Sequence, residues 1–440
     1  MKARRALIIG GSLGGLFAAN LLRMIGWEVD VYERVADDLA ARGAGIATHD
    51  EMFDTLRRLG VVIDDTIGIK VSDRVFYDSN GKVIATLKVN RYMSSWVRFY
   101  RPLKDLLPEK NYHFGMNFTR FEETPEGVTA HFSDGTRASG DLLIGADGIW
   151  SAVRAQWLPE VKPEYAGYIA WRGMVEERDF PPKLRGEIVP IHTFCLPEGQ
   201  YMLTYPVPGQ DDDTRAGYRR TNFVWYHPVL PEKLTELCTD ASGKCHGVAI
   251  PPHLIRKAFI DEMRAFSRAH FAPQIADVVD LTQQPFFQAI FDCASPHIAQ
   301  GRVALLGDAA FVGRPHAGMG TTKAALDAQY LIDALIAANG ELAPALVDYN
   351  ESRCLFGNRL VARNRWLGAH MSAHLSKPKS QRTPDELAHR PPDVTMREFG
   401  AKLCDIADLA PIACRFSTRG VLWAMQCAHC GTTITVAWAM

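Results

Sequence analysis

Short apolar runs that each end at a glycine or an acidic residue recur along this chain. Residues 5–9 form a run long enough for one buried strand, and residues 10–15 follow with the sequence Gly-Gly-Ser-Leu-Gly-Gly. Apolar residues then recur at helical spacing over 16–25, and residues 28–33 form a second strand pattern that ends in an acid. This order of strand, glycine turn, helix and strand predicts a βαβ unit that binds a dinucleotide.

The glycine turn indicates how the dinucleotide would be held. Glycine lets the backbone approach a pyrophosphate, which then lies at the N-terminus of the following helix. Glu33 lies about 20 residues further on, where a carboxylate accepts hydrogen bonds from a ribose. Because Ser12 occupies the middle glycine position, the motif alone is also compatible with an ordinary tight turn. The preceding strand and the following acid favour the dinucleotide.

Two later segments repeat the arrangement of a buried strand that ends in a turn. Residues 141–148 have the sequence Asp-Leu-Leu-Ile-Gly-Ala-Asp-Gly, and Ser151 is placed to cap the helix that follows. Residues 302–310 form a third apolar strand that ends in Gly-Asp-Ala-Ala, and residues 318–320 open a helix over 321–338. We expect these segments to belong to the same dinucleotide-binding domain.

The rest of the pattern is mainly that of antiparallel strands. Alternation over 71–89 and 117–137, each with a glycine turn, predicts two hairpins. The segment 165–226 is strand-rich and aromatic, which predicts a mixed sheet with one face over a ligand pocket. A helix over 254–271 would cover this sheet. Most of the aromatic residues are also compatible with ordinary core packing.

Composition and charge exclude several classes of protein. The chain has 440 residues, 47% of them hydrophobic and 22% charged, which indicates a soluble protein of two or three domains. Its net charge of -1 implies neither a nucleic-acid-binding surface nor a polybasic membrane patch. The nine cysteines are scattered, which favours a reducing cytoplasm over a disulfide framework. The N-terminal apolar run is too short for a signal peptide.

The C-terminal stretch 421–440 has no Asp, Glu, Lys or Arg. Because it contains Gln426, His429 and three threonines, it makes a poor membrane span. A packed element or a subunit contact is the expectation, and a tail anchor is the alternative. Cys427 and Cys430 form one CxxC without a second pair, so we expect no zinc and no other metal.

Three separated segments together resemble a known family. Residues 10–33, Asp147-Gly148 and Gly307-Asp308 resemble the signatures of the FAD-dependent aromatic hydroxylases, the single-component class A flavoprotein monooxygenases. The stretch 307–328 is the longest and most specific of these signals. Within it, Phe311 replaces the histidine that most relatives carry.

Within that family, further residues resemble the 2,6-dihydroxypyridine hydroxylase-like branch. They are Ser12, the segments 165–168 and 171–173, residues 205–209, and Arg314-Pro315-His316. The resemblance covers roughly residues 1–370 and leaves the C-terminal part without a functional interpretation.

The resemblance implies an α/β fold in which a Rossmann-like FAD-binding domain of the glutathione-reductase type carries an inserted mixed β-sheet substrate domain. The FAD-binding domain would comprise residues 1–70, 96–162 and 290–370, the substrate domain 71–95 and 163–289, and the C-terminal extension 371–440.

The resemblance also implies the FAD contacts, and the helix that opens at 318–320 would stabilise negative charge on reduced flavin by up to ~2 kcal/mol. The implied contacts are Gly10, Ser12, Leu13, Gly14 and Gly15 at the pyrophosphate, Glu33 at the adenosine ribose with Arg34 beside it, Gly45 and Ile46 along the isoalloxazine ring, Arg101 neutralising pyrophosphate charge, Asp147, Gly148 and Arg154 for FAD and transient nicotinamide binding, Asp308 at the ribityl chain, and Gly318, Met319, Gly320 and Thr321 at the N1–C2=O edge.

The reaction that the resemblance implies is hydroxylation of a small hydroxylated aromatic or N-heteroaromatic ring with NAD(P)H and O₂, through a flavin C4a-hydroperoxide. Tyr205 and Arg172 are the first candidates for ring contacts, and His316 could take a proton from a ring hydroxyl. The alternatives are core packing for Tyr205, a structural ion pair for Arg172, a hydrogen bond within its own turn for His316 and a surface salt bridge for Arg101. A homodimer is a family expectation.

Three other functions remain open at this point. A related flavoenzyme could epoxidise or dehydrogenate its substrate, a similar fold could serve as a nucleotide-binding scaffold without catalysis, and an NAD-only dehydrogenase would bind no flavin. The Gly307-Asp308 motif argues against the NAD-only dehydrogenase. The family resemblance implies that FAD, the longer cofactor, needs this segment and that NAD does not.

Overall fold

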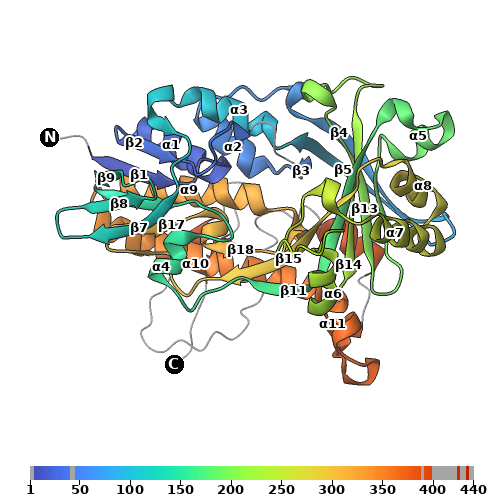
Figure 1. The fold of residues 1–440 in the computed structure, drawn as a ribbon. Coiled ribbons are helices and arrows are strands. Elements are labelled where there is room, and N and C mark those ends of the chain that lie inside the picture. The colour runs from blue at the N-terminus through green and yellow to red at the C-terminus, as the bar shows by residue number, and fades with distance from the viewer. Residues whose placement is uncertain (1–3, 40–44, 388–390, 399–423, 427–432, 436–440) are drawn as a thin grey trace.

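Two β-sheets, side by side, form the framework of the chain (Figure 1). The computed structural model describes residues 4–39, 45–387, 391–398, 424–426 and 433–435. The six-stranded sheet contains the first two strands of the chain. The nine-stranded sheet contains the long strands from the middle of the chain.

The six-stranded sheet contains the βαβ unit that the sequence predicts. Strand β1 lies between β2 and β10 and pairs with both in parallel. Helix α1 (Leu13–Met24) connects β1 to β2, and helix α9 (Gly320–Ala337) packs against α1. The strands in order across this sheet are β16 (Ala299–Gln300), β17 (Val303–Leu305), β10 (Leu142–Gly145), β1 (Arg5–Ile9), β2 (Glu28–Tyr32) and β6 (Tyr112–His113).

Four helices and a small sheet complete this half of the molecule. The helices are α2 (Asp50–Arg58), α3 (Val97–Leu106), α4 (Ala152–Trp157) and α10 (Leu342–Leu367). The predicted hairpin over 117–137 is present, and a third strand joins it. This three-stranded sheet consists of β7 (Phe118–Glu123), β8 (Val128–Phe132) and β9 (Arg137–Gly140).

The nine-stranded sheet is mixed, because β12 pairs in parallel with β4 and in antiparallel with β13. The hairpin predicted over 71–89 is its β4–β5 pair. The strands in order are β18 (Phe311–Val312), β15 (Phe286–Ala294), β11 (Glu164–Glu176), β14 (Arg220–Pro228), β13 (Tyr201–Val207), β12 (His192–Cys195), β4 (Ile69–Tyr77), β5 (Val83–Ser95) and β3 (Gly45–Ala47).

The two faces of the nine-stranded sheet have different partners. On one face, Trp225 packs at 5.4 Å between ring centroids against Phe266 of α7 (Lys257–His270), the helix that the sequence predicts over 254–271. Helices α5 (Pro182–Ile188), α6 (Pro231–Leu237) and α8 (Pro273–Leu281) also lie on this side. We call it the helix-covered face. The opposite face, which we call the tyrosine face, carries Tyr168, Tyr201, Tyr205 and Tyr226.

The C-terminal helices close one end of the tyrosine face. Met371 of α11 (Ala369–Ser376) and Met396 of α13 (Pro392–Glu398) are buried in the same apolar cluster as the tyrosines. Helix α12 (Pro384–Leu387) lies between them in the chain. Cys427 and Cys430 fall outside the described residues, as does most of the stretch 421–440 apart from strands β19 (Ala424–Gln426) and β20 (Thr433–Thr435). Among the helices described, none is long and apolar enough to cross a membrane.

Candidate cofactor and substrate site

The turn after β1 requires glycine because the protein packs tightly around it. Gly10 has a φ of +107°, which disfavours other residues, and a Cβ atom at Gly15 would lie 1.9 Å from the carbonyl oxygen of Gly10. The hydroxyl of Tyr112 donates to the carbonyl oxygen of Gly11 over 2.9 Å. A Cβ atom at Gly11 would lie 2.1 Å from that hydroxyl. The turn is therefore held in one shape by its neighbours.

Glu33 fixes the same turn from the end of β2. Its carboxylate accepts hydrogen bonds from the backbone N–H of Gly11 (2.9 Å) and of Val35 (3.0 Å), and the residue is buried. A cavity of about 240 Å³ lies beside this contact and includes Ser12, Glu33 and Arg34 in its wall. Leu13 is buried in the core below the turn. The sequence motif and the acid thus meet at one cavity.

The Asp147-Gly148 turn lines the same cavity from β10. The Asp147 carboxylate accepts from the Ser151 hydroxyl (2.5 Å) and from the backbone N–H of Ala152 (2.7 Å). It therefore caps helix α4 together with Ser151, whose hydroxyl oxygen accepts from the N–H of Arg154 (2.9 Å), as the sequence predicts. Burial raises the pKa of Asp147, against the effect of these hydrogen bonds.

Arg154 connects two of the predicted cofactor segments. Its guanidinium is buried and donates to the carbonyl oxygen of Ile149, next to the Asp147-Gly148 turn, and to that of Ala309 over 2.9 Å. Because all of these acceptors belong to the protein backbone, Arg154 positions the two turns.

The Gly307-Asp308 turn is held from beneath by a buried group of three charges. Asp327 accepts from the backbone N–H of Gly307 (2.9 Å) and pairs with Lys323 (2.7 Å) and Arg353 (2.7 Å). Lys323 also donates to the carbonyl oxygen of Gly307 (2.7 Å). Both backbone groups of this glycine, whose φ is +59°, are thereby fixed. Lys323 and Asp327 lie within the motif stretch 307–328, but no role for these three residues could be predicted from it.

Asp308 is presented outward by that turn. Its side chain is exposed, in contrast to its neighbours Gly307 and Ala309, which are buried. The surrounding protein raises the pKa of Asp308 by disfavouring its charged form, and Lys323 and Arg154 act in the opposite direction. An exposed carboxylate above a rigid turn is suited to accept hydrogen bonds from ligand hydroxyls.

The N-terminus of α9 lies next in the chain. Gly318 is in the left-handed region at a φ of +66°, Met319 is buried, and Gly320 begins the helix with its backbone exposed. Thr321 is half-buried beside it. The first N–H groups of a helix have no acceptor within it, and the helix dipole makes this end favourable for negative charge.

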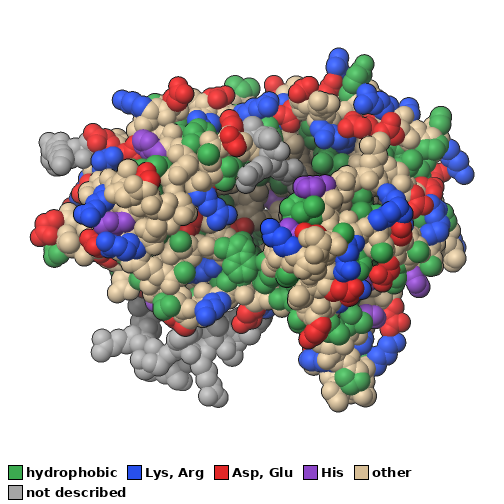
Figure 2. Space-filling view, in the orientation of Figure 1, with side chains coloured by type: hydrophobic (Ala, Val, Ile, Leu, Met, Phe, Trp, Pro, Cys, Tyr) green, Lys and Arg blue, Asp and Glu red, His purple; other side chains and the backbone are tan. Residues whose placement is uncertain are grey.

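The chemical groups around this site match those that an FAD molecule would need as partners. The glycine turn leaves room for a pyrophosphate, Glu33 and Asp308 offer carboxylates for two sugar-like chains, and α9 offers N–H groups for an anionic ring edge. Arg101 is exposed on α3, which packs beside α1. A space-filling view shows a hollow between the two halves of the molecule (Figure 2).

The tyrosine face meets the predicted cofactor site at Gly45. The Tyr205 hydroxyl donates to the carbonyl oxygen of Gly45 over 3.1 Å, and a Cβ atom at Gly45 would lie 2.4 Å from a Val207 methyl carbon. Arg172, on β11, is half-buried and donates to the side-chain oxygen of Gln288 over 3.1 Å. Burial raises the pKa of Tyr205, and the neighbouring Arg172 partly offsets the rise. Tyr205 and Arg172 therefore lie close together, and their role as ring contacts stays a prediction.

His316 meets the tyrosine face on the other side. Its Nε2 atom lies 2.7 Å from the Tyr168 hydroxyl, and its ring lies 4.7 Å from that of Tyr226 between centroids. Tyr168 lies on β11, so the partner of His316 Nε2 comes from another element. The alternative, a hydrogen bond within the histidine's own turn, does not apply to this nitrogen. Burial, with Arg314 and His370 nearby, lowers the pKa of His316 well below its usual value of 6.5. The imidazole is therefore neutral near pH 7.

A second ionic group, centred on the buried Asp292, holds the loop that carries His316. Asp292 accepts from Arg314 (2.7 Å) and from Arg365 (2.9 Å), and Arg314 also donates to the Ser372 hydroxyl (2.8 Å). Helices α10 and α11 are thereby tied to the loop. The spacing of these residues in the sequence gives no sign that they meet.

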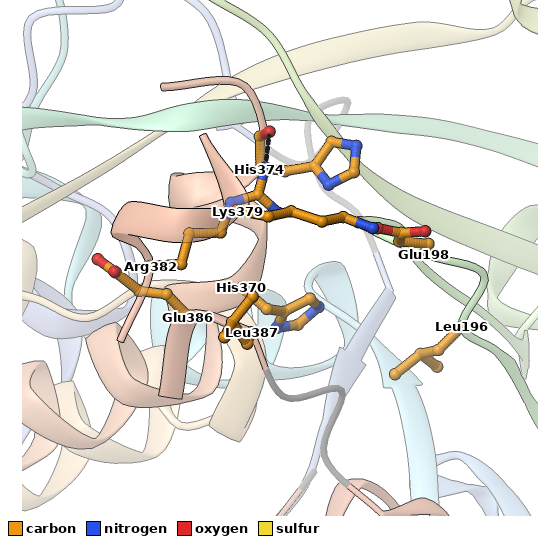
Figure 3. A pocket seen from close by; sticks show the side chains of 9 residues that line it. Leu196, Glu198, His370, His374, Lys379, Arg382, Glu386 and Leu387 are labelled. Carbon is orange, nitrogen blue, oxygen red and sulfur yellow. Dashed lines mark hydrogen bonds and ion pairs between the residues drawn. The ribbon is translucent and has the colours of Figure 1, made fainter. Parts of the chain in front are cut away.

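A separate cavity of about 280 Å³ opens under the C-terminal helices (Figure 3). Its charges are largely matched within the protein, because Lys379 pairs with Glu198 (2.5 Å) and Glu386 with Lys377 (2.6 Å). His370 and Leu196 also line a much smaller space that reaches His316. Nothing in the lining favours one charge, so we assign it no ligand.

Comparisons with known proteins agree with this geometry. The family model described as "FAD binding domain" matches residues 4–183 and 259–364, and a second, "FAD binding domain-like", matches 165–292. The chain is 32% identical to 2,6-dihydroxypyridine 3-monooxygenase of Paenarthrobacter nicotinovorans, over 75% of this chain and 82% of that protein. It is 30% identical to 6-hydroxynicotinate 3-monooxygenase of Pseudomonas fluorescens, over 83% of this chain and 92% of that protein.

Solved structures of FAD-dependent hydroxylases are also similar to this chain. The structure of 2,6-dihydroxypyridine-3-hydroxylase from Arthrobacter nicotinovorans has a TM-score of 0.79 at 28% identity and covers 89% of this chain and 98% of its own. Klebsiella pneumoniae HpxO with FAD and uric acid has a TM-score of 0.67 at 26% identity, covering 85% and 90%. The resemblance inferred from the sequence is thus confirmed, and the chain belongs to the family of FAD-dependent aromatic monooxygenases.

Proposed function

We propose that this enzyme uses NAD(P)H and O₂ to hydroxylate a small N-heteroaromatic ring that already carries hydroxyl groups, as in 2,6-dihydroxypyridine. The observation that supports this most is the contact of Tyr205 with Gly45, because it brings the tyrosine face against the segment proposed to lie along the flavin ring. The substrates named for the two curated relatives described above are hydroxylated pyridines.

We propose cofactor roles for the residues around the cavity of about 240 Å³ and the start of α9. The glycine turn, Glu33 and Arg34 would hold the adenosine and pyrophosphate end, with Arg101 supplying positive charge. Asp308 would bind the ribityl hydroxyls. The residues that would complete the site are Gly45, Ile46, Asp147, Gly148, Arg154, Gly318, Met319, Gly320 and Thr321.

Bound FAD would supply the chemistry that joins NAD(P)H, O₂ and the aromatic ring. The chain's own residues would orient the ring, exclude water and manage one proton. Arg172 and Tyr205 would contact the ring, since both lie on the tyrosine face next to Gly45. His316, paired with Tyr168, would take the proton from a ring hydroxyl, because its imidazole is neutral and buried.

A substrate screen tests the proposed function. Purified enzyme would be given hydroxylated pyridines and phenols while NAD(P)H oxidation, O₂ uptake and product mass are recorded. We expect one hydroxylated pyridine to gain one oxygen atom, with ¹⁸O₂ labelling the product. A product that has lost two hydrogens or gained an epoxide would contradict hydroxylation, and absence of turnover with a flavin-loaded enzyme would favour a scaffold.

Replacing Asp308 with alanine is expected to weaken FAD binding roughly 10- to 100-fold, because a carboxylate that accepts from hydroxyls contributes about 1.5–3 kcal/mol. Titration of apoprotein with FAD, followed by flavin fluorescence, measures the change. Asp348→Ala, which removes an exposed carboxylate on α10, is the control and should bind FAD normally. Full FAD affinity in Asp308→Ala would rule out the proposed ribityl contact.

Replacing His316 with glutamine is expected to slow hydroxylation about 100-fold or more, the usual contribution of a general base. Because the pKa of His316 lies well below 6.5, the imidazole stays uncharged as the pH falls through 6.5. The wild-type rate should therefore show no loss from His316 protonation near that pH. Single-turnover rates and coupling across pH 5.5–8 would check this, and an unchanged rate and profile in the variant would exclude the base.

A cytoplasmic location and a homodimer complete the proposal. Free cysteines support a reducing compartment, and among the described residues Cys195, Cys238, Cys245, Cys293 and Cys354 are all free. Cell fractionation and the mass of the purified enzyme in solution test the two statements.

A further inference from the structure

We infer that Asn222 is a substrate-binding residue, whose side-chain N–H donates to an acceptor-only oxygen on the ring, so that the substrate binds as its oxo or oxyanion form. This inference rests on the proposed function and names the substrate form that the site selects. The residue lies on β14 and plays no part in the cofactor site described above.

The side-chain N–H of Asn222 makes no hydrogen bond of normal geometry, although the Tyr205 hydroxyl lies close to it. The residue is buried at 2% exposure, and its Nδ2 atom has no hydrogen-bond partner. Among the described residues, it is the one buried side-chain amide whose nitrogen lacks a partner. A buried donor left unpaired destabilises the protein, and a ligand that brings an acceptor would remove this cost.

The position of Asn222 indicates what that partner is. In the register of β13 and β14, Asn222 lies directly opposite Tyr205, and cross-strand partners point to the same face of a sheet. Val224 and Tyr226, two and four residues further along β14, belong to the tyrosine face. The Tyr205 hydroxyl bonds to Gly45, which is proposed to lie along the flavin ring. Asn222 therefore lies beside the place proposed for the substrate.

The chemistry of the neighbours restricts the form of the ligand. The amide of Asn222 and the guanidinium of Arg172 both lie close to the Tyr205 hydroxyl, where they oppose the rise in its pKa that burial causes. Tyr205 already donates its hydrogen to Gly45. An oxo group or an oxyanion accepts from these N–H donors and needs no acceptor of its own. A neutral ring hydroxyl can also accept from them, but it carries a hydrogen that requires an acceptor as well. Hydroxypyridines reach the oxo form by moving the proton to the ring nitrogen, which phenols cannot do.

The experiment compares two ligands on three flavin-loaded enzymes without turnover. The probes are 2,6-dihydroxypyridine and resorcinol, which place two oxygens alike on a ring with and without a nitrogen. Dissociation constants come from the change in the flavin absorption spectrum. We expect the wild type to bind 2,6-dihydroxypyridine at least about tenfold more tightly than resorcinol, and Asn222→Leu to lose about tenfold for the pyridine only.

Thr221→Val is the matched control. Thr221 directly precedes Asn222 on β14. It is also buried, and its side-chain oxygen also has no hydrogen-bond partner. It lies opposite Val175 in the register, which belongs to the helix-covered face. Both ligands should bind Thr221→Val as they bind the wild type, because only the tyrosine face meets the ring.

Stability without ligand gives a second readout. If the Asn222 amide has no partner in the free enzyme, Asn222→Leu should unfold at the same urea concentration as the wild type or a higher one. A clear drop in that midpoint would show that the amide has a structural role and would overturn the inference. Unchanged pyridine binding in Asn222→Leu would also overturn it while leaving the proposed function intact. Failure of the wild type to bind any hydroxylated pyridine in the wider screen would instead remove the proposed function, and the inference with it.

Discussion

Replacing Asp327 with asparagine is expected to lower the free energy of unfolding by about 3–5 kcal/mol, since it leaves two buried cations without their counter-charge. Lys323, Asp327 and Arg353 are all buried, and the aspartate bonds to both cations and to the Gly307 N–H. Because Gly307 carries the Asp308 turn, the variant should also bind FAD more weakly. Urea unfolding and FAD titration measure the two effects.

The pH dependence of this effect has a definite sign. Burial alone would raise the pKa of Asp327, but Lys323 and Arg353 outweigh it and the pKa is lowered in the folded chain. The carboxylate therefore stabilises the fold at pH values above about 3.9, the usual value for aspartate, and this contribution is lost as the pH falls further. The difference between wild type and Asp327→Asn should persist from pH 8 to about pH 5 and shrink in acid.

A second aspartate on the same helix provides the control. Asp333 pairs with Arg58 at 2.6 Å, and its side chain is 46% exposed. An exposed ion pair contributes about 0–1 kcal/mol, so Asp333→Asn should unfold almost like the wild type. Equal stability of Asp327→Asn and Asp333→Asn would contradict the importance of the buried group.

Replacing Gly15 with alanine is expected to yield a protein that purifies without flavin. The added Cβ would lie 1.9 Å from the Gly10 carbonyl oxygen, a backbone atom that cannot move without opening the turn. The same change at Gly14 would place the Cβ 2.9 Å from the end of the flexible Leu306 side chain. We therefore expect a graded result in the visible spectrum near 450 nm, with flavin absent from Gly15→Ala and largely retained by Gly14→Ala.

Circular dichroism separates loss of cofactor from loss of fold in these variants. A helical spectrum close to that of the wild type, with no flavin absorbance after FAD is supplied, is the expected outcome for Gly15→Ala. Normal flavin content in that variant would mean that the turn can widen, contrary to the packing of Gly10, Gly11 and Tyr112.

Local sequence determined the elements that depend only on neighbouring residues. Periodicity and glycine placement predicted β1, α1 and β2 within a few residues, because a buried parallel strand and an amphipathic helix each bury side chains in a repeating pattern. The cap formed by Ser151 and the hairpin of β4 and β5 were predictable for the same reason. The family followed from three motifs, each readable within a short segment.

Tertiary structure decided which distant residues share a site. Lys323 and Asp327 are four residues apart on one helix, a spacing that could have drawn attention to charges within an apolar stretch, but Arg353 comes from another helix. Asn222 has no motif around it, and only the pairing with Tyr205 places it near Gly45.

The sequence by itself therefore determined the βαβ unit, the flavin family and the aromatic character of the inserted sheet. The tertiary structure alone decided that Arg154, Asp327 and Asp292 serve as supports for loops, and that Asn222 faces the same side as Tyr205. The physical reason is that a helix or strand is selected by spacings of two to four residues along the chain. A buried charge or amide is defined by partners that strand pairing and helix packing bring from far along the chain.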